Sequence, residues 1–253
     1  MIIFNKRKLH QPLVSIITVT LNSEKFIEET FDSIKNQKNK NYELIIVDGG
    51  SKDNTINIIK KNEDIINYCV SEKDNGIYDA FNKGLKIALG KYIVFVNSDD
   101  ILTPEAIELL NKYDREYQDI DFIFGSVKKH WGVLYGYKPH KIKYTWGFYS
   151  SHSTGFYIKR NSAKKIGMYN VKYKYHADFD YFYRMIVKLK MKGIGTRKDE
   201  LFGIFRRGGY SSKVDFKDSY LEDLRIRRDN GQGFLILTLI AIFKFIKNFQ
   251  RFF

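Results

Sequence analysis

Two adjacent carboxylates, Asp99 and Asp100, follow a continuous apolar run at residues 92–96. Such a run predicts a strand that is buried on both faces. Open α/β sheets bind ligands at the carboxyl ends of such strands, and two acids there could hold a hard divalent cation and, through it, a diphosphate. The alternative is a strand end followed by a helix cap, because Thr103-Pro104 is typical of a helix start.

Two earlier apolar runs also end in polar side chains. Residues 13–19 lead into Thr20 and Asn22, and residues 42–47 lead into Asp48 and two glycines. In a parallel sheet these strand ends line one edge. Asp48 could accept the N–H of a pyrimidine base there, and the glycines let the backbone approach a ligand closely. The sequence contains neither a P-loop nor G-x-G-x-x-G, which argues against nucleotide triphosphatases and dinucleotide enzymes.

Apolar runs alternate with segments of helical spacing in the first half of the chain. This alternation predicts an α/β fold with a mostly parallel, doubly wound sheet. After Gly125 aromatic residues and lysines interleave, and the clearest element is a helix near residues 178–192. The predicted strands lie at residues 13–19, 42–47, 66–70, 92–96 and 122–124, and the predicted helices at residues 23–37, 54–61, 77–89 and 104–113.

The composition limits the class of protein. The chain has 253 residues, of which 43% are hydrophobic, so it can bury one substantial core and is too apolar to be disordered. Its single cysteine, Cys69, excludes an intrachain disulfide framework and a multi-cysteine zinc site. Residues 1–10 lack the apolar core of a signal peptide, so we expect a cytoplasmic protein.

The net charge of +14 is distributed unevenly. Residues 1–124 carry 16 Lys and Arg against 20 Asp and Glu, whereas residues 125–214 carry 20 against 4. A basic middle region suits a polyanion, an anionic membrane surface or a phosphorylated substrate. The alternative is a lysine-rich face that is simply solvated.

The last segment, residues 233–253, mixes Phe, Ile and Leu with basic residues. The apolar run before Lys244 has 11 residues, which is short of the roughly 20 needed to span a bilayer. In a helix, Lys244, Lys247 and Arg251 would lie near one side, so the composition predicts an amphipathic helix in the membrane interface. A core helix docked on the domain and an oligomer contact are the alternatives.

Six motifs occur in an order that resembles glycosyltransferase family 2 with its GT-A fold, and the resemblance covers roughly residues 12 to 212. Four of them are residues 14–22 (VSIITVTLN), 43–53 (ELIIVDGGSKD), 72–84 (EKDNGIYDAFNKG) and 97–100 (NSDD). Residues 176–184 (HADFDYFYR) resemble the family's acidic motif ahead of an arginine, and residues 205–211 (FRRGGYS) resemble its flexible loop near the donor. In this order the motifs are highly specific.

The resemblance implies a nucleotide-sugar donor and inversion at the anomeric carbon. It implies that Thr18, Val19 and Asp48 bind the donor, with Val19 and Asp48 at the base. Arg207, or its neighbour Arg206, would pair with phosphate oxygens, as guanidinium groups do.

The resemblance also implies a metal site and a catalytic base. Asp99 would face the ribose or the metal, and Asp100 would hold Mg²⁺ or Mn²⁺ against the diphosphate. The chain has Ser98-Asp99-Asp100 where many relatives show a fuller D-x-D, which leaves open which acid carries the metal. Asp178 matches the base that removes the proton of the attacking hydroxyl, although Ala177 stands where an acid usually precedes it. Without the resemblance, Asp178 would be interpreted as a helix cap.

Other residues near these motifs have simpler interpretations. Asp180 and Arg184 are one turn apart and can pair with each other. His152 could bind the acceptor or a phosphate, but a lone histidine is more often structural. Trp131 and Trp146 could stack on sugar rings, and core packing explains them equally well.

We therefore expect a metal-dependent inverting hexosyl- or N-acetylhexosaminyltransferase that uses a nucleoside diphosphate sugar, a UDP-sugar above all. Its acceptor would be a glycan, lipid-linked, in cell-surface polysaccharide biosynthesis. Residues 12–212 would form the catalytic domain, and residues 213–253 a helical tail that associates with the inner face of the cell membrane. The alternatives are a nucleotidyltransferase, which would need a Gly- and Lys-rich loop after the first strand, and a basic nucleic-acid-binding protein, for which the sequence shows no module. We expect no nucleic-acid partner.

Overall fold

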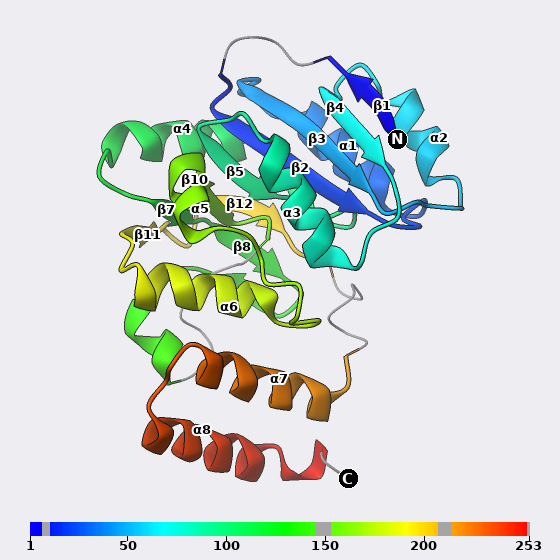
Figure 1. Cartoon of the computed structure of the whole chain (residues 1–253). Coiled ribbons are helices and arrows are strands. Elements are labelled where there is room, and N and C mark those ends of the chain that lie inside the picture. Colours follow the sequence, from blue (N-terminus) through cyan, green and yellow to red (C-terminus); the bar gives the residue numbers. More distant parts are fainter. Residues whose placement is uncertain (7–10, 145–152, 207–213, 252–253) are drawn as a thin grey trace.

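The structure, a computed structural model, describes residues 1–6, 11–144, 153–206 and 214–251. An eight-stranded sheet lies in its upper part (Figure 1). The strands are β1 (Ile2–Asn5), β2 (Val14–Thr20), β3 (Tyr42–Asp48), β4 (Tyr68–Ser71), β5 (Tyr92–Phe95), β7 (Phe122–Phe124), β10 (Phe156–Lys159) and β11 (Gly193–Gly195). Their order is β1-β4-β3-β2-β5-β10-β7-β11.

The middle of this sheet is parallel. β2 pairs in parallel with β3 on one side and with β5 on the other, so Val14 lies opposite both Tyr42 and Tyr92. β4 continues the parallel arrangement beyond β3. β1 runs antiparallel at the edge, and β10 runs antiparallel between β5 and β7. The predicted α/β class with a mostly parallel sheet is confirmed.

Helices pack on both faces of the sheet. They include α1 (Ile27–Lys35), α2 (Thr55–Lys61), α3 (Ile77–Ile87), α4 (Ala106–Glu116), α5 (Arg160–Ile166) and α6 (Ala177–Tyr183). Helices α1, α2 and α4 share one buried apolar cluster, whereas α3, α5 and α6 share another. The neighbours Ile16 and Ile17 enter opposite clusters, because successive side chains of a strand point to opposite faces. The predicted doubly wound arrangement is therefore confirmed.

A second, four-stranded sheet was not predicted. Its strands are β6 (Ile101–Leu102), β8 (Ser126–Lys129), β9 (Gly132–Leu134) and β12 (Leu201–Ile204), in the order β6-β12-β8-β9. β12 pairs with β6 and with β8, which precede it by about a hundred and about seventy-five residues. Such short strands from distant segments carry little local signal. A short helical turn, η1 (Pro139–Lys143), and a π-helical continuation of α6, η2 (Arg184–Lys188), complete this half.

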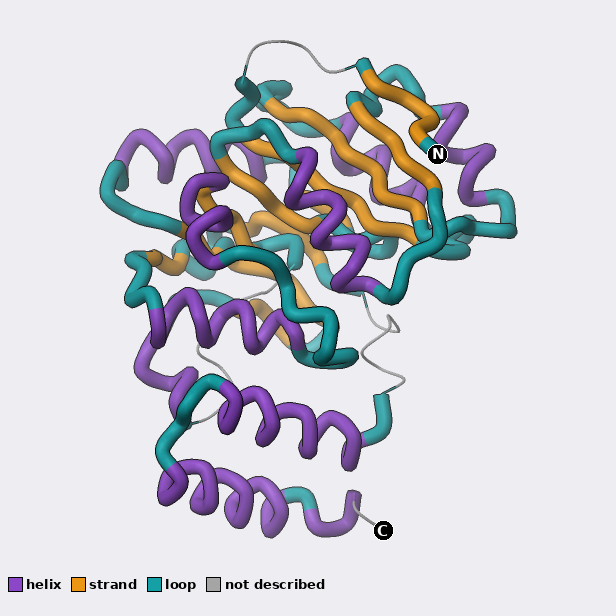
Figure 2. Tube along the Cα trace, in the orientation of Figure 1, coloured by secondary structure: helices purple, strands orange, loops and turns teal. Residues whose placement is uncertain are grey.

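The C-terminal part is helical, as predicted. It comprises α7 (Phe216–Asp229), α8 (Phe234–Lys247) and η4 (Phe249–Arg251). Figure 2 shows that these helices form two layers below α6, with α7 between α6 and α8. Within the described residues, no helix combines the length and apolar character needed to cross a bilayer. The division of the chain at residue 212 stays a prediction.

Candidate active site

The strand ends β2, β3 and β4 meet at one edge of the sheet. In the ladder Thr20 lies opposite Asp48, and Asp48 lies opposite Ser71. Residues 96–100 continue from β5, which pairs with β2 in the same direction. The parallel register therefore brings the polar residues that follow these strands to a common edge, where ligands bind in open α/β sheets.

Asp48 is fully buried and holds the loop that follows β3. Its Oδ2 accepts hydrogen bonds from the backbone N–H groups of Gly50 and Ser51, both at 3.0 Å, and from the Ser71 hydroxyl at 2.6 Å. Its Oδ1 accepts one from the Ser51 hydroxyl at 2.5 Å. Gly50 has a backbone φ of +88°, a conformation that residues other than glycine rarely adopt. The carboxylate thus fixes the shape of this loop.

Polar atoms without partners also occur near this edge. The buried hydroxyls of Thr18 and Thr20, and the side-chain carbonyl oxygen of Asn97, have no hydrogen-bond partner among the described residues. Val19, between the two threonines, is buried in the apolar cluster that it shares with α3. Buried polar groups are normally hydrogen-bonded, so these atoms are candidates for contact with water or a ligand.

Asp100 is buried, whereas Asp99 is half-buried. Asp100 Oδ2 accepts hydrogen bonds from Thr154 Oγ1 at 2.8 Å and from Ser153 Oγ at 3.2 Å. Asp100 Oδ1 is buried and has no partner in the described part of the chain. Burial, together with the neighbouring charge of Asp99, raises the pKa of Asp100 to about 7. Burial also raises the pKa of Asp99, and the charge of Arg206 opposes that rise.

These features fit a divalent cation. An unpartnered carboxylate oxygen beside a second carboxylate is a hard anionic ligand pair, and a cation would relieve the repulsion between the two acids. The described residues contain no cluster of three or more His, Cys, Asp or Glu side chains suited to a metal. Two carboxylates are nevertheless enough for ions such as Mg²⁺, which complete their coordination with water and substrate phosphates.

The predicted phosphate-binding arginines are only partly described. Arg206 is half-buried, forms an ion pair with Glu29 on α1 and lies 5.3 Å from the centre of the Phe26 ring. Its charge acts on both Asp99 and Asp100. Arg207 lies outside the described residues.

Asp178 occupies the first turn of α6 and is half-buried. Its Oδ1 accepts a hydrogen bond from the backbone N–H of Phe179 at 2.8 Å and one from the Tyr78 hydroxyl at 3.2 Å. The single proton of this hydroxyl is shared with the carbonyl oxygen of Tyr175, which lies 2.9 Å away. Tyr78 thus connects the start of α3 to the start of α6 and orients the candidate base. No role was predicted for Tyr78 from the sequence, and its position within the motif at residues 72–84 was the one signal that could have indicated it.

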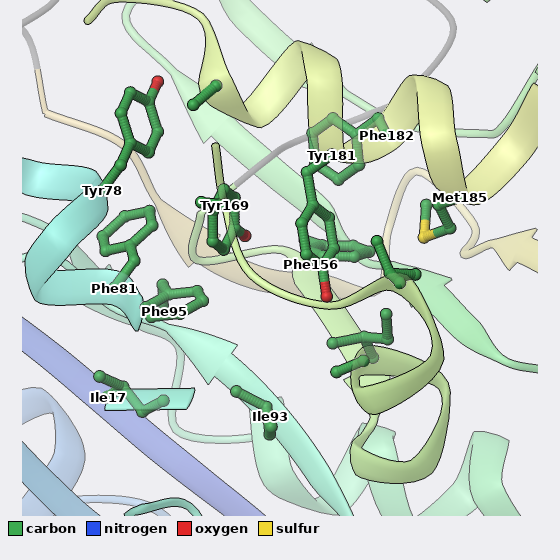
Figure 3. Close-up of a cluster of buried hydrophobic side chains, with 14 of the residues drawn as sticks. Ile17, Tyr78, Phe81, Ile93, Phe95, Phe156, Tyr169, Tyr181, Phe182 and Met185 are labelled. Carbon is green, nitrogen blue, oxygen red and sulfur yellow. The ribbon is translucent and has the colours of Figure 1, made fainter. Parts of the chain in front are cut away.

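An aromatic cluster sets the distance between α3 and α6. Figure 3 shows rings from α3, β5 and α6 grouped around Tyr169. Tyr169 stacks on Tyr181 of α6 at 4.3 Å between ring centres, and Phe81 of α3 stacks on Phe95 of β5 at 4.0 Å. Tyr169 also lies 5.8 Å from the ring of Tyr78. Rigid ring packing therefore supports the contact between Tyr78 and Asp178.

The remaining predictions have mixed outcomes. Asp180 is buried and pairs with Arg184 at 2.9 Å, as the one-turn spacing predicted. Trp131 is 60% exposed, so it is not a core residue. His152 and Trp146 lie outside the described residues. The hydrogen bonds that Ser153 and Thr154 donate to Asp100 were not predicted from the sequence, because these residues lie more than fifty positions later in the chain.

The basic residues of the tail do not all lie on one open side. Lys244 turns inward, and its Nζ lies 2.6 Å from Asp223 Oδ2 on α7. Burial lowers the pKa of Lys244, and the charge of Asp223 opposes this. The spacing places Lys244 near Lys247 on the helix, but its ammonium group is paired with Asp223 and is not a free cation on that side. The exposed large apolar residues of α8 and η4 are Phe234, Leu235, Leu239, Ile242, Phe243, Phe245, Ile246 and Phe249.

Comparisons with known proteins give the family. Residues 15–178 match the family model described as Glycosyl transferase family 2. The chain is also 30% identical over 233 residues to an uncharacterised glycosyltransferase of Methanocaldococcus jannaschii, and this match covers 86% of the chain and 76% of that protein.

Two solved structures share the fold. One is residues 1–349 of S. aureus TarS in complex with UDP-GlcNAc, with TM-score 0.66 and 21% identity. The match covers 85% of this chain and 66% of the TarS chain, so the chain spans just under two thirds of that fragment. The other is a mannosyltransferase of Pyrobaculum calidifontis in complex with GDP-Man and Mn²⁺, with TM-score 0.63 and 18% identity. This match covers 92% of this chain and 69% of the mannosyltransferase chain.

Proposed function

The chain belongs to glycosyl transferase family 2 and has the GT-A fold, and from this membership we propose that it transfers a sugar from a nucleoside diphosphate sugar to a hydroxyl of a glycan acceptor, with inversion at the anomeric carbon. We propose a UDP-sugar as donor and a hexose or N-acetylhexosamine as the transferred group. The TarS complex with UDP-GlcNAc supports this nucleotide, whereas the complex with GDP-Man makes GDP the competing choice.

The observation that carries the proposal is the unpartnered buried oxygen of Asp100 beside Asp99 at the strand ends. In the proposal Asp100 and Asp99 hold Mg²⁺ or Mn²⁺, and the Mn²⁺ in the mannosyltransferase complex supports that choice. A metal ion bound there offsets the negative charge that grows on the departing diphosphate.

The other donor contacts follow the same edge of the sheet. We assign Thr18, Val19 and Asp48 to the nucleoside end, with Asp48 acting also through the loop that it orders. Arg207 and Arg206 are assigned to the diphosphate. The half-buried position of Arg206 and its charge near Asp99 support this assignment.

Asp178 supplies the base in the proposed reaction. It takes the proton of the acceptor hydroxyl while the hydroxyl oxygen bonds to the anomeric carbon. The bond between that carbon and the phosphate oxygen breaks on the opposite side, and the nucleoside diphosphate leaves with the electron pair. Hydrogen bonds from Tyr78 and from the Phe179 N–H hold Asp178 Oδ1, which fixes the direction of the carboxylate.

A donor panel tests this proposal. Full-length protein is incubated with UDP-glucose, UDP-N-acetylglucosamine or GDP-mannose, with Mn²⁺, with Mg²⁺ or with a chelator, and the released nucleoside diphosphate is measured with water as acceptor. We expect metal-dependent release from a UDP-sugar. Release that is equal with chelator and with Mn²⁺ contradicts the metal site, and release from GDP-mannose alone contradicts the choice of UDP.

We further propose that the acceptor is lipid-linked and that α8 rests on the inner face of an anionic membrane, with the protein otherwise in the cytoplasm. Leu235, Leu239, Ile242 and Ile246 recur at helical spacing, and each is more than half exposed. An apolar helix face of this kind suits the boundary between headgroups and acyl chains. The excess of basic residues at 125–214 adds attraction to an anionic surface. Cell-surface polysaccharide biosynthesis is the corresponding role.

A further inference from the structure

The face of α7 that points into the protein is mostly polar. Burying polar groups is unfavourable unless each is hydrogen-bonded, so the partners of these groups indicate what the face does. Ile226 is the apolar exception, and it joins the core cluster that includes α6. The polar members lie on one side of the helix and are Ser219, Glu222, Asp223 and Arg227, with Asn230 at the C-cap.

Glu222 binds three consecutive backbone amides. Its Oε1 accepts the N–H of Lys174 at 2.6 Å, and its Oε2 accepts those of Tyr175 at 2.7 Å and His176 at 2.8 Å. Glu222 is buried, so water does not compete strongly for these bonds. The three residues directly precede Ala177, where α6 begins. One carboxylate from a distant segment thus fixes the point at which this helix starts.

Other side chains of α7 hold the same region. Ser219 Oγ lies 2.8 Å from His176 Nε2. The guanidinium group of Arg227 lies 4.8 Å from the centre of the Phe179 ring, and Asn230 Nδ2 donates to Asp180 Oδ1 at 2.8 Å. Residues on both sides of Asp178 are therefore held by α7 and its C-cap, Asn230, while Asp178 Oδ1 contacts Tyr78 and the Phe179 N–H.

We propose that Glu222 is a positioning residue for Asp178. It holds the backbone at 174–176 and thereby sets the direction in which the first turn of α6 presents the Asp178 carboxylate. This inference rests on the proposed role of Asp178 as base. A displacement of about 1 Å at a reacting group can cost about 10²-fold in rate, so a side chain that touches no substrate can control catalysis in this way.

The principal test compares Glu222→Gln with Asp218→Asn in the full-length protein. The amide side chain that Glu222→Gln introduces can accept at one end only, so at least one of the three N–H bonds is lost. Asp218 lies one turn earlier on the exposed side of α7, and its contact there is a long one, 3.5 Å from the Tyr175 hydroxyl. Asp218→Asn removes an equal charge without touching the three amides. Amide hydrogen exchange at residues 174–176 should accelerate in Glu222→Gln and stay unchanged in Asp218→Asn.

The kinetic readout separates positioning from folding. With UDP-glucose, UDP-N-acetylglucosamine and GDP-mannose as probes, we expect Glu222→Gln to lower kcat for nucleotide release about tenfold, because the base is misplaced. The donor KM should stay within about twofold, because the donor contacts lie on other elements. Asp218→Asn should change neither value. An unchanged kcat in Glu222→Gln overturns the inference, as does an equal loss in Asp218→Asn.

A double substitution distinguishes this inference from the proposed function. If Glu222 acts through Asp178, adding Glu222→Gln to Asp178→Asn lowers kcat no further, and a second full tenfold loss contradicts the inference. If Asp178→Asn alone releases nucleotide at the wild-type rate, the base assignment fails and this inference fails with it. If Asp178→Asn is slow but Glu222→Gln is normal, only the positioning role fails. Should Glu222→Gln unfold, Ser219→Ala removes the His176 contact alone, and we expect a two- to threefold lower kcat with unchanged KM.

Discussion

The donor half and the base half of the candidate site are built in different ways. The donor half comprises the ends of β2, β3 and β5 with Asp48, Asp99 and Asp100, and most of it comes from residues 14–100. The base half comprises Asp178 with Tyr78 and Glu222, which come from three helices. Strand register places the first group, whereas packing between helices places the second.

This difference determines how each half responds to change. The donor-half carboxylates lie at or shortly after the ends of buried strands, so strand pairing largely sets their position. Asp178 depends on the Tyr78 hydroxyl, on the aromatic rings around Tyr169 and on amides held by Glu222. We therefore expect substitutions in the donor half to affect binding and those in the base half to affect the rate of the chemical step.

The largest expected effect is in the base half. Asp178→Asn keeps the size of the side chain and an acceptor oxygen but removes its basicity. We expect nucleotide release to slow by about 10²–10⁴-fold, the range for a positioned general base. Release is measured in single turnovers at saturating donor and Mn²⁺. A wild-type rate in this variant would mean that Asp178 only stabilises the start of α6.

In the donor half, we expect the raised pKa of Asp100 to make the stability of the protein depend on pH. The pKa of Asp100 is about 7 in the folded protein, above its ordinary value of 3.8. Its contribution to stability is thus complete below about pH 3.8 and is lost as the pH rises toward 7. Without metal, we expect the free energy of unfolding to fall by on the order of 2–4 kcal/mol across this window.

Urea titrations at pH 5 and pH 8, in the presence of a chelator, measure this fall. In Asp100→Asn, which cannot ionise at this position, the decrease should be much smaller. Saturating Mn²⁺ should also reduce the decrease in the wild type, because a bound cation favours the ionised carboxylate. If the free energy of unfolding depends on pH in the same way in wild type and variant, Asp100 does not have a raised pKa in the folded protein.

The tail helix α8 lies outside both halves, and its effect should be confined to membranes. Leu239→Glu places a charge on the exposed apolar face and should lower binding to phosphatidylglycerol vesicles by at least about tenfold, since burying one such side chain contributes roughly 1.5–3 kcal/mol. Leu221→Glu, at a similarly exposed leucine on α7, is the matched control. Nucleotide release should be unchanged in both variants.

Vesicle co-sedimentation is the measurement. If the two variants sediment equally with the wild type, α8 serves another contact. Because Lys244 is paired with Asp223, we expect the salt dependence of binding to be weaker than three free cations at positions 244, 247 and 251 would give.

The smallest expected effect comes from Tyr78→Phe. Burial and the charge of Asp178 keep the pKa of Tyr78 well above its ordinary value, so the hydroxyl stays a donor at assay pH. Its removal loses a hydrogen bond worth about 1 kcal/mol, which corresponds to about fivefold in kcat. Donor KM should not change. A kcat equal to that of the wild type would show that the Phe179 N–H and the aromatic packing orient Asp178 without it.

The sequence predicted where the residues of the donor half lie better than it predicted the surroundings of Asp178. Apolar runs that end in acids define both the strands and the edge where Asp48 and Asp100 lie, so local pattern was sufficient. Glu222 was not recognised, because a Glu on a helix is usually solvated and its three amide partners lie 46 to 48 residues earlier in the chain. The pairing of Lys244 with Asp223 was missed for a related reason. Residue spacing shows which side of a helix a residue occupies, but not which element packs against that side.

Donor titration of two variants tests the central claim, that binding and proton removal belong to separate halves. Calorimetry with the best donor of the panel and Mn²⁺ is carried out on Asp178→Asn and Asp100→Ala. We predict that Asp178→Asn binds the donor as tightly as the wild type, and that Asp100→Ala loses the metal-dependent part of the affinity while its unfolding transition remains cooperative. Equal loss of affinity in both variants, or unchanged affinity in Asp100→Ala, would contradict the account.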